Sequence, residues 1–121
     1  MIQSFRDLDV WKTSMELTLV VYRLTGAFPR EEIYGLTSQI RRSAVSVPSN
    51  IAEGQSRSTT GEFKQFLGIA RGSNSELQTQ LQIARELAFG DKEKIISAEA
   101  LSQRVGKMLY ALLKSLNAKP R

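Results

Sequence analysis

Residues 34–54 read YGLTSQIRRSAVSVPSNIAEG, and this stretch contains the features that decide the fold. Apolar residues recur in it at steps of four, four, three and four, at Leu36, Ile40, Ala44, Val47 and Ile51. This spacing places them on one face of an α-helix, whereas a half-buried strand would show strict alternation. We therefore expect an amphipathic helix over residues 36–53.

Pro48 interrupts the apolar face of this helix. Proline has no backbone N–H, so Pro48 cannot bond to the carbonyl of Ala44, and the helix must either bend there or end at Val47. Ile51 continues the same apolar stripe beyond the proline. We therefore favour a bent helix that runs through Pro48 and ends at Gly54.

The same spacing in steps of three and four recurs in three other segments, and no sustained strand-like alternation is present. We expect helices over residues 9–26, 60–89 and 92–117. The core stripe expected in the first is Leu8, Trp11, Met15, Leu19 and Tyr22. Those expected in the other two are Phe63, Phe66, Leu67, Ala70, Leu77, Leu81, Ala84 and Ala88, and Ile95, Ala98, Leu101, Val105, Met108, Leu112 and Leu116.

Local signals support the ends of these helices. Thr59 followed by Glu62 fits a capping box, and Asp91 can cap the last helix. Gly26 and Gly90 are typical of helix C-termini. Four amphipathic helices with short connections predict an all-α fold, an up-and-down antiparallel four-helix bundle, as one domain over residues 1–121.

The residue types that the chain lacks exclude several kinds of chemistry. Without cysteine there is no disulfide, thiol nucleophile or thiolate metal site, and without histidine the commonest general base and metal ligand is missing. A di-metal carboxylate bundle would need Glu-x-x-His pairs. We therefore expect no enzymatic activity, no metal and no cofactor.

The sequence contains no signal for export or membrane insertion. Its first residues lack a basic segment followed by an apolar one, and the longest uncharged apolar run, residues 17–22, is far too short to span a bilayer. We therefore expect a soluble, cytoplasmic protein.

Positive charge is in excess and unevenly distributed. The net charge is +5, and residues 100–121 contain five basic and no acidic side chains. Such an excess attracts polyanions, although basic residues near a helix C-terminus are also favoured by the helix dipole alone.

A set of basic residues forms the candidate nucleic-acid contact. Arg41 and Arg42 are adjacent, and consecutive helical residues lie about 100° apart, so their side chains point to different faces. For these two arginines, ion pairs with another helix or subunit are the alternative to contact with phosphate. Two basic lines follow single expected helices: Lys64, Arg71, Gln78 and Arg85 recur at a spacing of seven on the third, and Arg104, Lys107 and Lys114 lie on the fourth. No aromatic residue interleaves with these basic lines, so we expect backbone-directed, weakly selective binding, and two solvated helix faces are the alternative. The candidates are Arg41, Arg42, Lys64, Arg71 and Arg85, then Arg104, Lys107 and Lys114.

Gly68 and Gly72 stand four residues apart in the third expected helix, and Ser75 follows them. Each glycine costs a helix about 1 kcal/mol relative to alanine. Small residues on one face permit close approach by another backbone, so we expect a helix or subunit contact there, with a tolerated weak spot as the alternative.

Four polar residues, Asn50, Glu53, Ser73 and Glu76, lie near the apolar stripes of the second and third expected helices. Two carboxylates could act as a general acid and base. Because buried polar groups usually hydrogen-bond to one another, we expect a structural polar network instead.

Ordered motifs along nearly the whole chain carry a resemblance to one family. They are Leu8, Trp11, Tyr22, Phe28-Pro29, Glu32, Tyr34-Gly35-Leu36, Gln39, Arg41-Arg42, Ser46-Val47-Pro48, Asn50-Ile51-Ala52-Glu53-Gly54, Phe63, Phe66-Leu67, Ile69-Ala70, Gly72-Ser73, Glu76-Leu77, Lys107-Met108-Leu109 and Leu112. The sequence resembles the four-helix-bundle proteins encoded by intervening sequences within bacterial 23S ribosomal RNA genes.

This resemblance implies a homopentamer, with bundles arranged as a barrel around a central channel. A related accessory protein of diversity-generating retroelements is basic and works with nucleic acid and a reverse transcriptase. We therefore predict a non-enzymatic homo-oligomeric scaffold that binds the backbone of RNA or DNA, or a nucleic-acid enzyme such as a reverse transcriptase. The alternative is a protein–protein interaction module without nucleic-acid affinity.

Overall fold

The computed structural model describes residues 4–118, and this part of the chain forms helices and no strand. The long helices are α1 (Asp9–Thr25), α2 (Leu36–Gln55), α3 (Thr60–Glu86) and α4 (Lys92–Ala118). Two single turns of 3-10 helix, η1 (Phe5–Asp7) and η2 (Arg30–Glu32), precede α1 and α2. The basic residues Lys119 and Arg121 lie outside the described residues.

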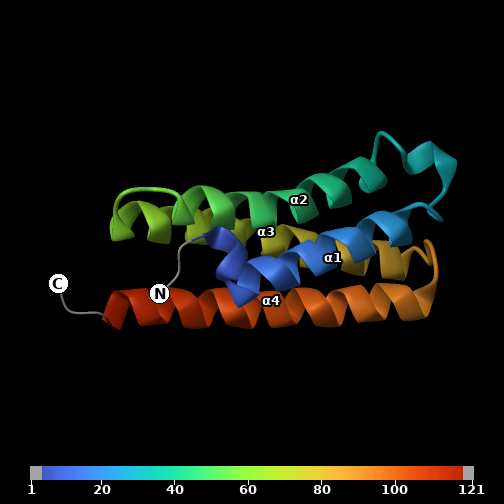
Figure 1. The fold of residues 1–121 in the computed structure, drawn as a ribbon. Helices are drawn as coiled ribbons and strands as arrows, with labels where there is room; N and C mark the ends of the chain where they lie inside the picture. The colour runs from blue at the N-terminus through green and yellow to red at the C-terminus, as the bar shows by residue number, and fades with distance from the viewer. Residues whose placement is uncertain (1–3, 119–121) are drawn as a thin grey trace.

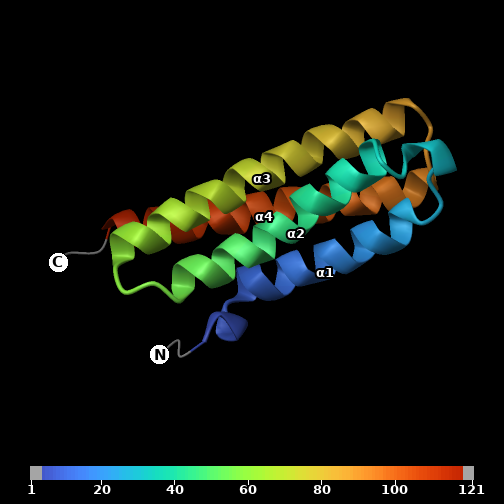
Figure 2. The same cartoon turned by 90° about the horizontal axis from the view of Figure 1, so that it is seen from above.

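The helices form an up-and-down antiparallel four-helix bundle, as the sequence predicts (Figure 1). The α1–α2 and α3–α4 connections lie at one end, and the α2–α3 connection lies at the other. α1 packs on α2 and α4, and α3 packs on the same two helices, whereas α1 and α3 do not touch. α1 and α3 therefore occupy opposite corners of the bundle (Figure 2).

The buried face of α1 differs from the expected one. Leu17 and Val21 are fully buried, whereas Leu19 and Tyr22 are 49% and 42% exposed. The half-buried Trp11 packs edge-to-face on Phe5, with ring centroids 5.2 Å apart, and belongs to the margin of the core. The expected stripe is confirmed at Leu8, which is buried, and was wrong at Leu19 and Tyr22. α1 has two apolar faces, and small Ser and Thr side chains lie on the one that the other helices cover.

The polar residues on the buried face of α1 are satisfied by the backbone. Thr18 Oγ1 donates to the carbonyl of Ser14 at 2.8 Å and also lies 3.1 Å from the carbonyl of Ala44 in α2. The Ala44 carbonyl is the group that Pro48 leaves without an intrahelical donor. α2 accordingly runs through Pro48, as expected, and the Thr18 hydroxyl, whose single proton is shared between the Ser14 and Ala44 carbonyls, partly replaces the missing hydrogen bond.

α2 ends at Gln55 and not at Gly54. Gly54 is buried, and a Cβ atom there would lie 2.7 Å from the Cβ of Phe66 and 3.1 Å from the ring of Phe63. The glycine therefore serves the close approach of α2 and α3, and it does not end the helix.

The capping predictions are confirmed at the starts of α3 and α4. The Glu62 amide donates to Thr59 Oγ1 at 3.1 Å, and the Glu93 amide donates to Asp91 Oδ1 at 2.9 Å. The expected end of α3 at residue 89 was wrong, because the helix stops at Glu86 and Ala88 turns away with a φ of 60°. Ala88 is exposed and does not belong to the core.

Candidate nucleic-acid interface

A surface groove between α3 and α4 brings basic residues of two helices together. On an α-helix, residues that are three, four or seven positions apart lie on the same face. Where α3 and α4 pack side by side, such a face of α3 therefore runs along a corresponding face of α4. We call this site the α3–α4 groove, and its volume is about 410 Å³. It is lined by Arg71, Asn74, Ser75 and Gln78 of α3 and by Gln103, Gly106, Lys107 and Tyr110 of α4.

A buried polar pair fixes the floor of the α3–α4 groove. Asn74 Nδ2 donates to the Ser102 carbonyl at 2.9 Å, and Ser102 Oγ donates to Asn74 Oδ1 at 2.8 Å. Asn74 and Ser102 are 2% and 0% exposed. A Cβ atom at Gly106 would lie 3.2 Å from Asn74 Nδ2, so this glycine keeps the floor open. Reciprocal hydrogen bonds between buried groups hold α3 and α4 in one register.

Arg71, Lys107 and Tyr110 form the outer part of the groove. The Arg71 guanidinium lies over the Tyr110 ring, with Cζ 5.3 Å from its centroid, a favourable cation–π geometry. No ion pair among the described residues involves Arg71 or Lys107. The expectation that no aromatic residue accompanies the basic lines was wrong, because Tyr110 lies one turn after Lys107 and faces Arg71 only once α3 and α4 pack.

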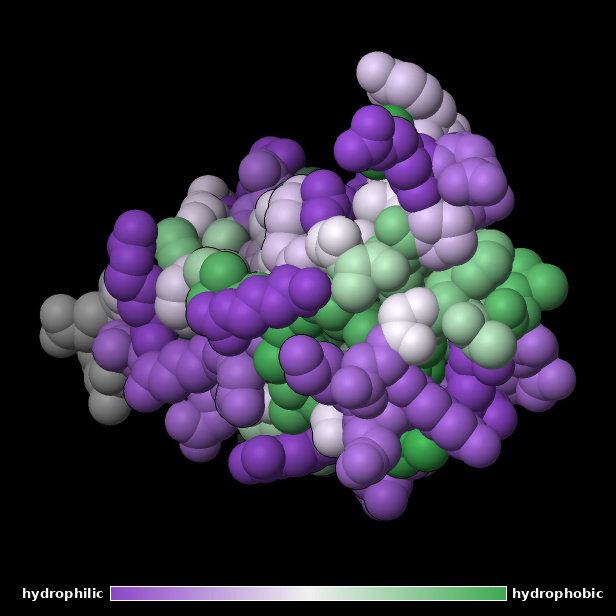
Figure 3. All heavy atoms as spheres, turned by 90° about the vertical axis from the view of Figure 1, so that its right-hand side faces the viewer, coloured by the Kyte–Doolittle hydropathy of each residue, from purple (hydrophilic) through white to green (hydrophobic). Residues whose placement is uncertain are grey.

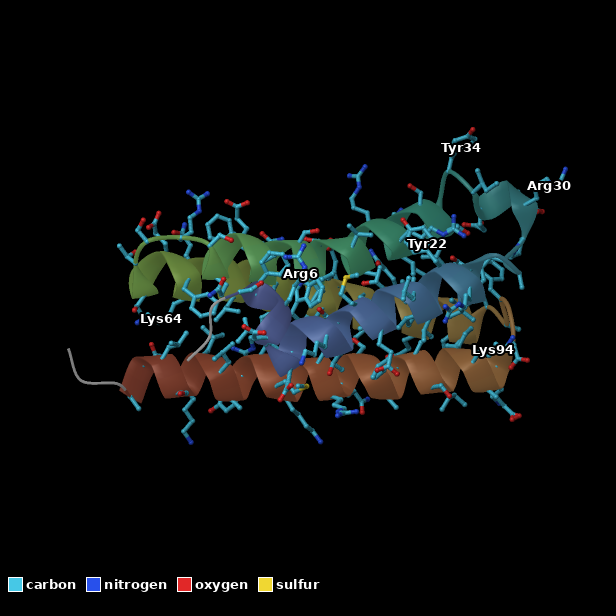
Figure 4. The ribbon with its side chains drawn as sticks, in the orientation of Figure 1. Arg6, Tyr22, Arg30, Tyr34, Lys64 and Lys94 are labelled. Carbon is cyan, nitrogen blue, oxygen red and sulfur yellow. The ribbon has the colours of Figure 1, made fainter. Side chains whose placement is uncertain are left out.

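The remaining basic residues of α3 and α4 differ in their surroundings. Lys64 Nζ donates to Asn117 Oδ1 at 2.9 Å, which ties the start of α3 to the last turns of α4 (Figure 4). Arg85 is paired with Glu99, with Nε 2.9 Å from Oε1, so its charge is largely neutralised. Lys114 is exposed two turns after Lys107. Arg104 is exposed but does not line the α3–α4 groove.

Arg41 serves the structure of the bundle. Its Nε donates to the buried Thr25 Oγ1 at 2.8 Å, its Nη2 lies 3.4 Å from the Tyr22 carbonyl, and its Cζ lies 4.6 Å from the centroid of the Tyr22 ring. The expected alternative of an ion pair with another helix is not found among the described residues. Arg41 instead satisfies acceptors at the C-terminal end of α1, where positive charge is favoured by the helix dipole.

Arg42 lies on another face and lines a separate recess between α2 and α3. The recess has a volume of about 310 Å³ and also contains Tyr34, Glu76 and Gln80. No residue of α2 lines the α3–α4 groove, so neither Arg41 nor Arg42 shares that site.

The expected polar network exists in part between α2 and α3. Ser46 Oγ and Ser73 Oγ are 2.8 Å apart, and Asn50 Nδ2 donates to Ser46 Oγ at 2.9 Å. Ser43 Oγ donates to Glu76 at 3.4 Å. Glu53 is not part of this network and pairs with Arg57 on its own helix at 2.8 Å. The sequence did not predict the part that Ser43 and Ser46 play in this network; they precede Asn50 by two turns and one turn of α2.

Gly68, Gly72 and Ser75 lie on an exposed face of α3. A Cβ atom at Gly68 or Gly72 would have nothing within 4 Å, so these glycines contact no other helix of the same chain. The interpretation as a contact within the bundle was therefore wrong, and a contact with another subunit stays a prediction.

Several large apolar side chains are exposed on the described surface. They include the pairs Leu19 and Tyr22 on α1, Ile83 and Leu87 on α3, and Ile33 and Tyr34 in the α1–α2 connection. Tyr34 is 98% exposed and points away from the bundle (Figure 4). Figure 3 shows hydrophobic surface among hydrophilic side chains at the end that carries two of the connections. Gathered apolar side chains mark contact surfaces.

Two further kinds of site are not found within residues 4–118. No group of three or more acidic residues is placed to hold a metal ion. No helix of this part of the chain has the length and apolar character needed to cross a membrane.

By its fold and its groove, the protein is an antiparallel four-helix bundle that has a basic surface groove containing a tyrosine. The model of the family described as 23S rRNA-intervening sequence protein matches residues 6–111, so the chain belongs to this family. The fold is similar to a crystal structure of a protein of unknown function from the S23 ribosomal protein family of Bacteroides thetaiotaomicron. The TM-score is 0.78 at 22% identity, covering 87% of this chain and 98% of that chain. No curated protein matches the chain.

Proposed function

We propose that this protein is a non-enzymatic, homo-oligomeric scaffold in the cytoplasm that binds the backbone of RNA or DNA through the α3–α4 groove. The observation that carries the proposal is the convergence of Arg71 and Lys107 on one groove. Neither side chain is paired with a carboxylate of the described residues. Unpaired guanidinium and ammonium groups that share a groove are suited to successive phosphates.

The charge around the groove supports the same proposal. Lys64, which bonds to Asn117 near the end of α4, and Lys114, two turns after Lys107, add further positive charge on the same two helices. The whole chain has a net charge of +5, which favours association with polyanions. Arg41 and Arg85 are engaged within the bundle and do not belong to the proposed interface.

The dependence of binding on salt tests this function. We expect the affinity for mixed RNA or DNA to fall steeply with salt, because each phosphate contact on duplex DNA releases about 0.9 counterion. The double variant Arg71→Gln with Lys107→Gln should lower the slope by roughly 2. Binding can be followed by fluorescence anisotropy with a labelled oligonucleotide.

A charge-matched control separates the groove from net charge. The double variant Lys12→Gln with Arg23→Gln removes the same charge from exposed positions on α1, a helix that contributes no residue to the α3–α4 groove. It should leave the slope nearly unchanged. If both double variants weaken binding equally, the groove is not the site. If no nucleic acid binds at low salt and a protein partner is retained at high salt, the protein is an interaction module instead.

The proposed oligomer rests on two largely exposed faces of the bundle. One is the outer stripe of α1, where Leu19 and Tyr22 are exposed and Trp11 and Met15 are half-buried. The other is the small-residue face of α3, with Gly68, Gly72 and Ser75. Bulky side chains on one face and small residues on the other are complementary in shape. A contact between unlike faces is heterologous, and repeated contacts of this kind close into a ring when the rotation permits. A pentamer is the number that the family resemblance implies.

A further inference from the structure

We propose that the α3–α4 groove takes a single-stranded segment of RNA or DNA, with one unpaired base stacked on the ring of Tyr110. This inference rests on the proposed function and specifies its ligand. It follows from the one feature of the groove that phosphate binding does not use, which is an exposed aromatic ring between cationic side chains.

Tyr110 is placed as a platform. The residue is 54% exposed, although the neighbouring Leu109 is fully buried in the core and anchors this turn of α4. Arg71 restrains the ring from the α3 side, with Cζ 5.3 Å from the centroid. A ring that is held by a guanidinium and still exposed can receive a second planar group, and every nucleobase has a suitable face.

The rest of the groove fits the remainder of a nucleotide. Arg71 and Lys107 provide positive charge for the phosphates on either side of the stacked base. The amides of Gln78 and Gln103 can each donate and accept a hydrogen bond, and they line the same groove. Base edges present mixtures of donors and acceptors, so such amides complement them without requiring one particular base.

The geometry of the groove favours a single strand over a duplex. The α3–α4 groove, with a volume of about 410 Å³, lies between two helices and is floored by Asn74 and Gly106, and the Tyr110 ring stands at its outer part. In a duplex the bases are paired and stacked on each other, and contact with an aromatic side chain would first require that stacking to be broken. Single strands offer their base faces freely.

The test compares three ligands on the unaltered protein. They are a labelled thymidine strand of about 20 nucleotides, which exceeds the roughly 4–16 nucleotides of a typical single-strand site, an abasic strand of equal length, and the matching duplex. We expect the thymidine strand to bind between about 5-fold and about 100-fold more tightly than the abasic strand, the range that one stacked base provides. The duplex should bind more weakly than the thymidine strand.

Variants of Tyr110 assign this preference to the ring. Tyr110→Leu should abolish the difference between the thymidine and abasic strands and leave the salt slope unchanged, because it removes no charge. Tyr110→Phe keeps the stacking face and should retain the difference. The matched control is Tyr34→Leu, which removes another exposed tyrosine at the far end of the connection between α1 and α2.

The outcomes separate this inference from the proposed function. If all three ligands bind equally, and the salt slope still falls in the variant that lacks Arg71 and Lys107, the stacking platform is refuted and backbone binding stands. If none of the ligands binds at low salt, both proposals fail. Because the comparison of the thymidine and abasic strands needs no variant, equal binding of the two refutes the platform even if Tyr110→Leu does not fold, and Tyr110→Phe then shows whether a preference belongs to the ring or to its hydroxyl group.

Discussion

Ala88 occupies a backbone conformation that ordinarily belongs to glycine. Its φ is 60°, and it ends α3 in a Schellman motif, in which the Phe89 amide bonds to the Ala84 carbonyl at 2.9 Å and the Ala88 amide bonds to the Arg85 carbonyl at 3.1 Å. Two residues later Gly90 has a φ of 68°, and a Cβ atom there would lie 2.9 Å from the Phe28 ring. The turn between α3 and α4 thus uses two left-handed residues, of which only the second is a glycine.

Ala88→Gly should stabilise the protein by about 1 kcal/mol, because it relieves the steric cost of a Cβ atom in the left-handed region. For a domain of this size the melting temperature should rise by roughly 4 °C, measured by circular dichroism. Gly90→Ala is the opposing variant and should lower it, since the added methyl group meets both an unfavourable φ and Phe28. A melting temperature that falls in Ala88→Gly would contradict the assignment.

At the scale of the element, α2 continues through a proline, and a hydroxyl of α1 that is shared with the Ser14 carbonyl provides a donor for the carbonyl that the proline leaves unpaired. Thr18 Oγ1 lies 3.1 Å from the Ala44 carbonyl, and both residues are buried, at 8% and 1% exposed. A carbonyl left unpaired in such a place would cost about 1–3 kcal/mol. The hydrogen bond therefore allows Ile51 to remain on the buried face of an unbroken helix.

Thr18→Val should destabilise the protein by about 1–3 kcal/mol, because it retains the shape of the side chain and leaves the Ala44 carbonyl without a donor. In a Pro48→Ala background the restored N–H can serve that carbonyl, so the same substitution should cost less. Urea unfolding of the two single variants and the double variant gives the coupling directly. Thr79→Val is a control, because Thr79 bonds only to Ser75 on its own exposed helix face, at 3.1 Å. Equal costs of Thr18→Val in both backgrounds would show that the two residues act independently.

At the scale of the whole molecule, the cyclic order of the helices separates the two uncovered faces. α1 and α3 occupy opposite corners, so the outer stripe of α1 and the small-residue face of α3 cannot meet within one chain. The α3–α4 groove borders the second face, because Ser75 belongs to both. In the proposed oligomer, the nucleic-acid groove would therefore run along the margin of each subunit contact.

Gly72→Leu should reduce the mass of the oligomer, because a large side chain would occupy the face that the next subunit approaches. Its helical content should persist, since nothing within 4 Å of a Cβ atom at this position opposes it and leucine is the better helix former. Sedimentation of the parent should give about five times 13.5 kDa, if the proposed pentamer is correct. Ala100→Leu adds a similar side chain to an exposed position of α4 and should leave the mass unchanged. A parent that sediments as a monomer at micromolar concentration would refute the oligomer.

Of the candidate interface, the sequence supplied Arg71 and Lys107 but not Tyr110. The two basic residues stand out in lines along single helices, which periodicity detects. Tyr110 acquires its place only through α3, since its partner Arg71 lies on that helix. The same limit explains Arg41, whose partners Thr25 and Tyr22 belong to α1.

The sequence alone determined that the chain forms four helices, where α3 and α4 begin, and that α2 passes through Pro48. These are local properties, because hydrophobic period and capping involve residues within a turn or two of each other. Only the tertiary structure decided which face of α1 is buried. It also decided that Gly54, where a Cβ atom would lie 2.7 Å from the Cβ of Phe66, is the glycine at which α2 and α3 approach each other closely, while Gly72 stays exposed. Burial and proximity depend on which surfaces of separate helices meet, and that is a property of packing that no single helix contains.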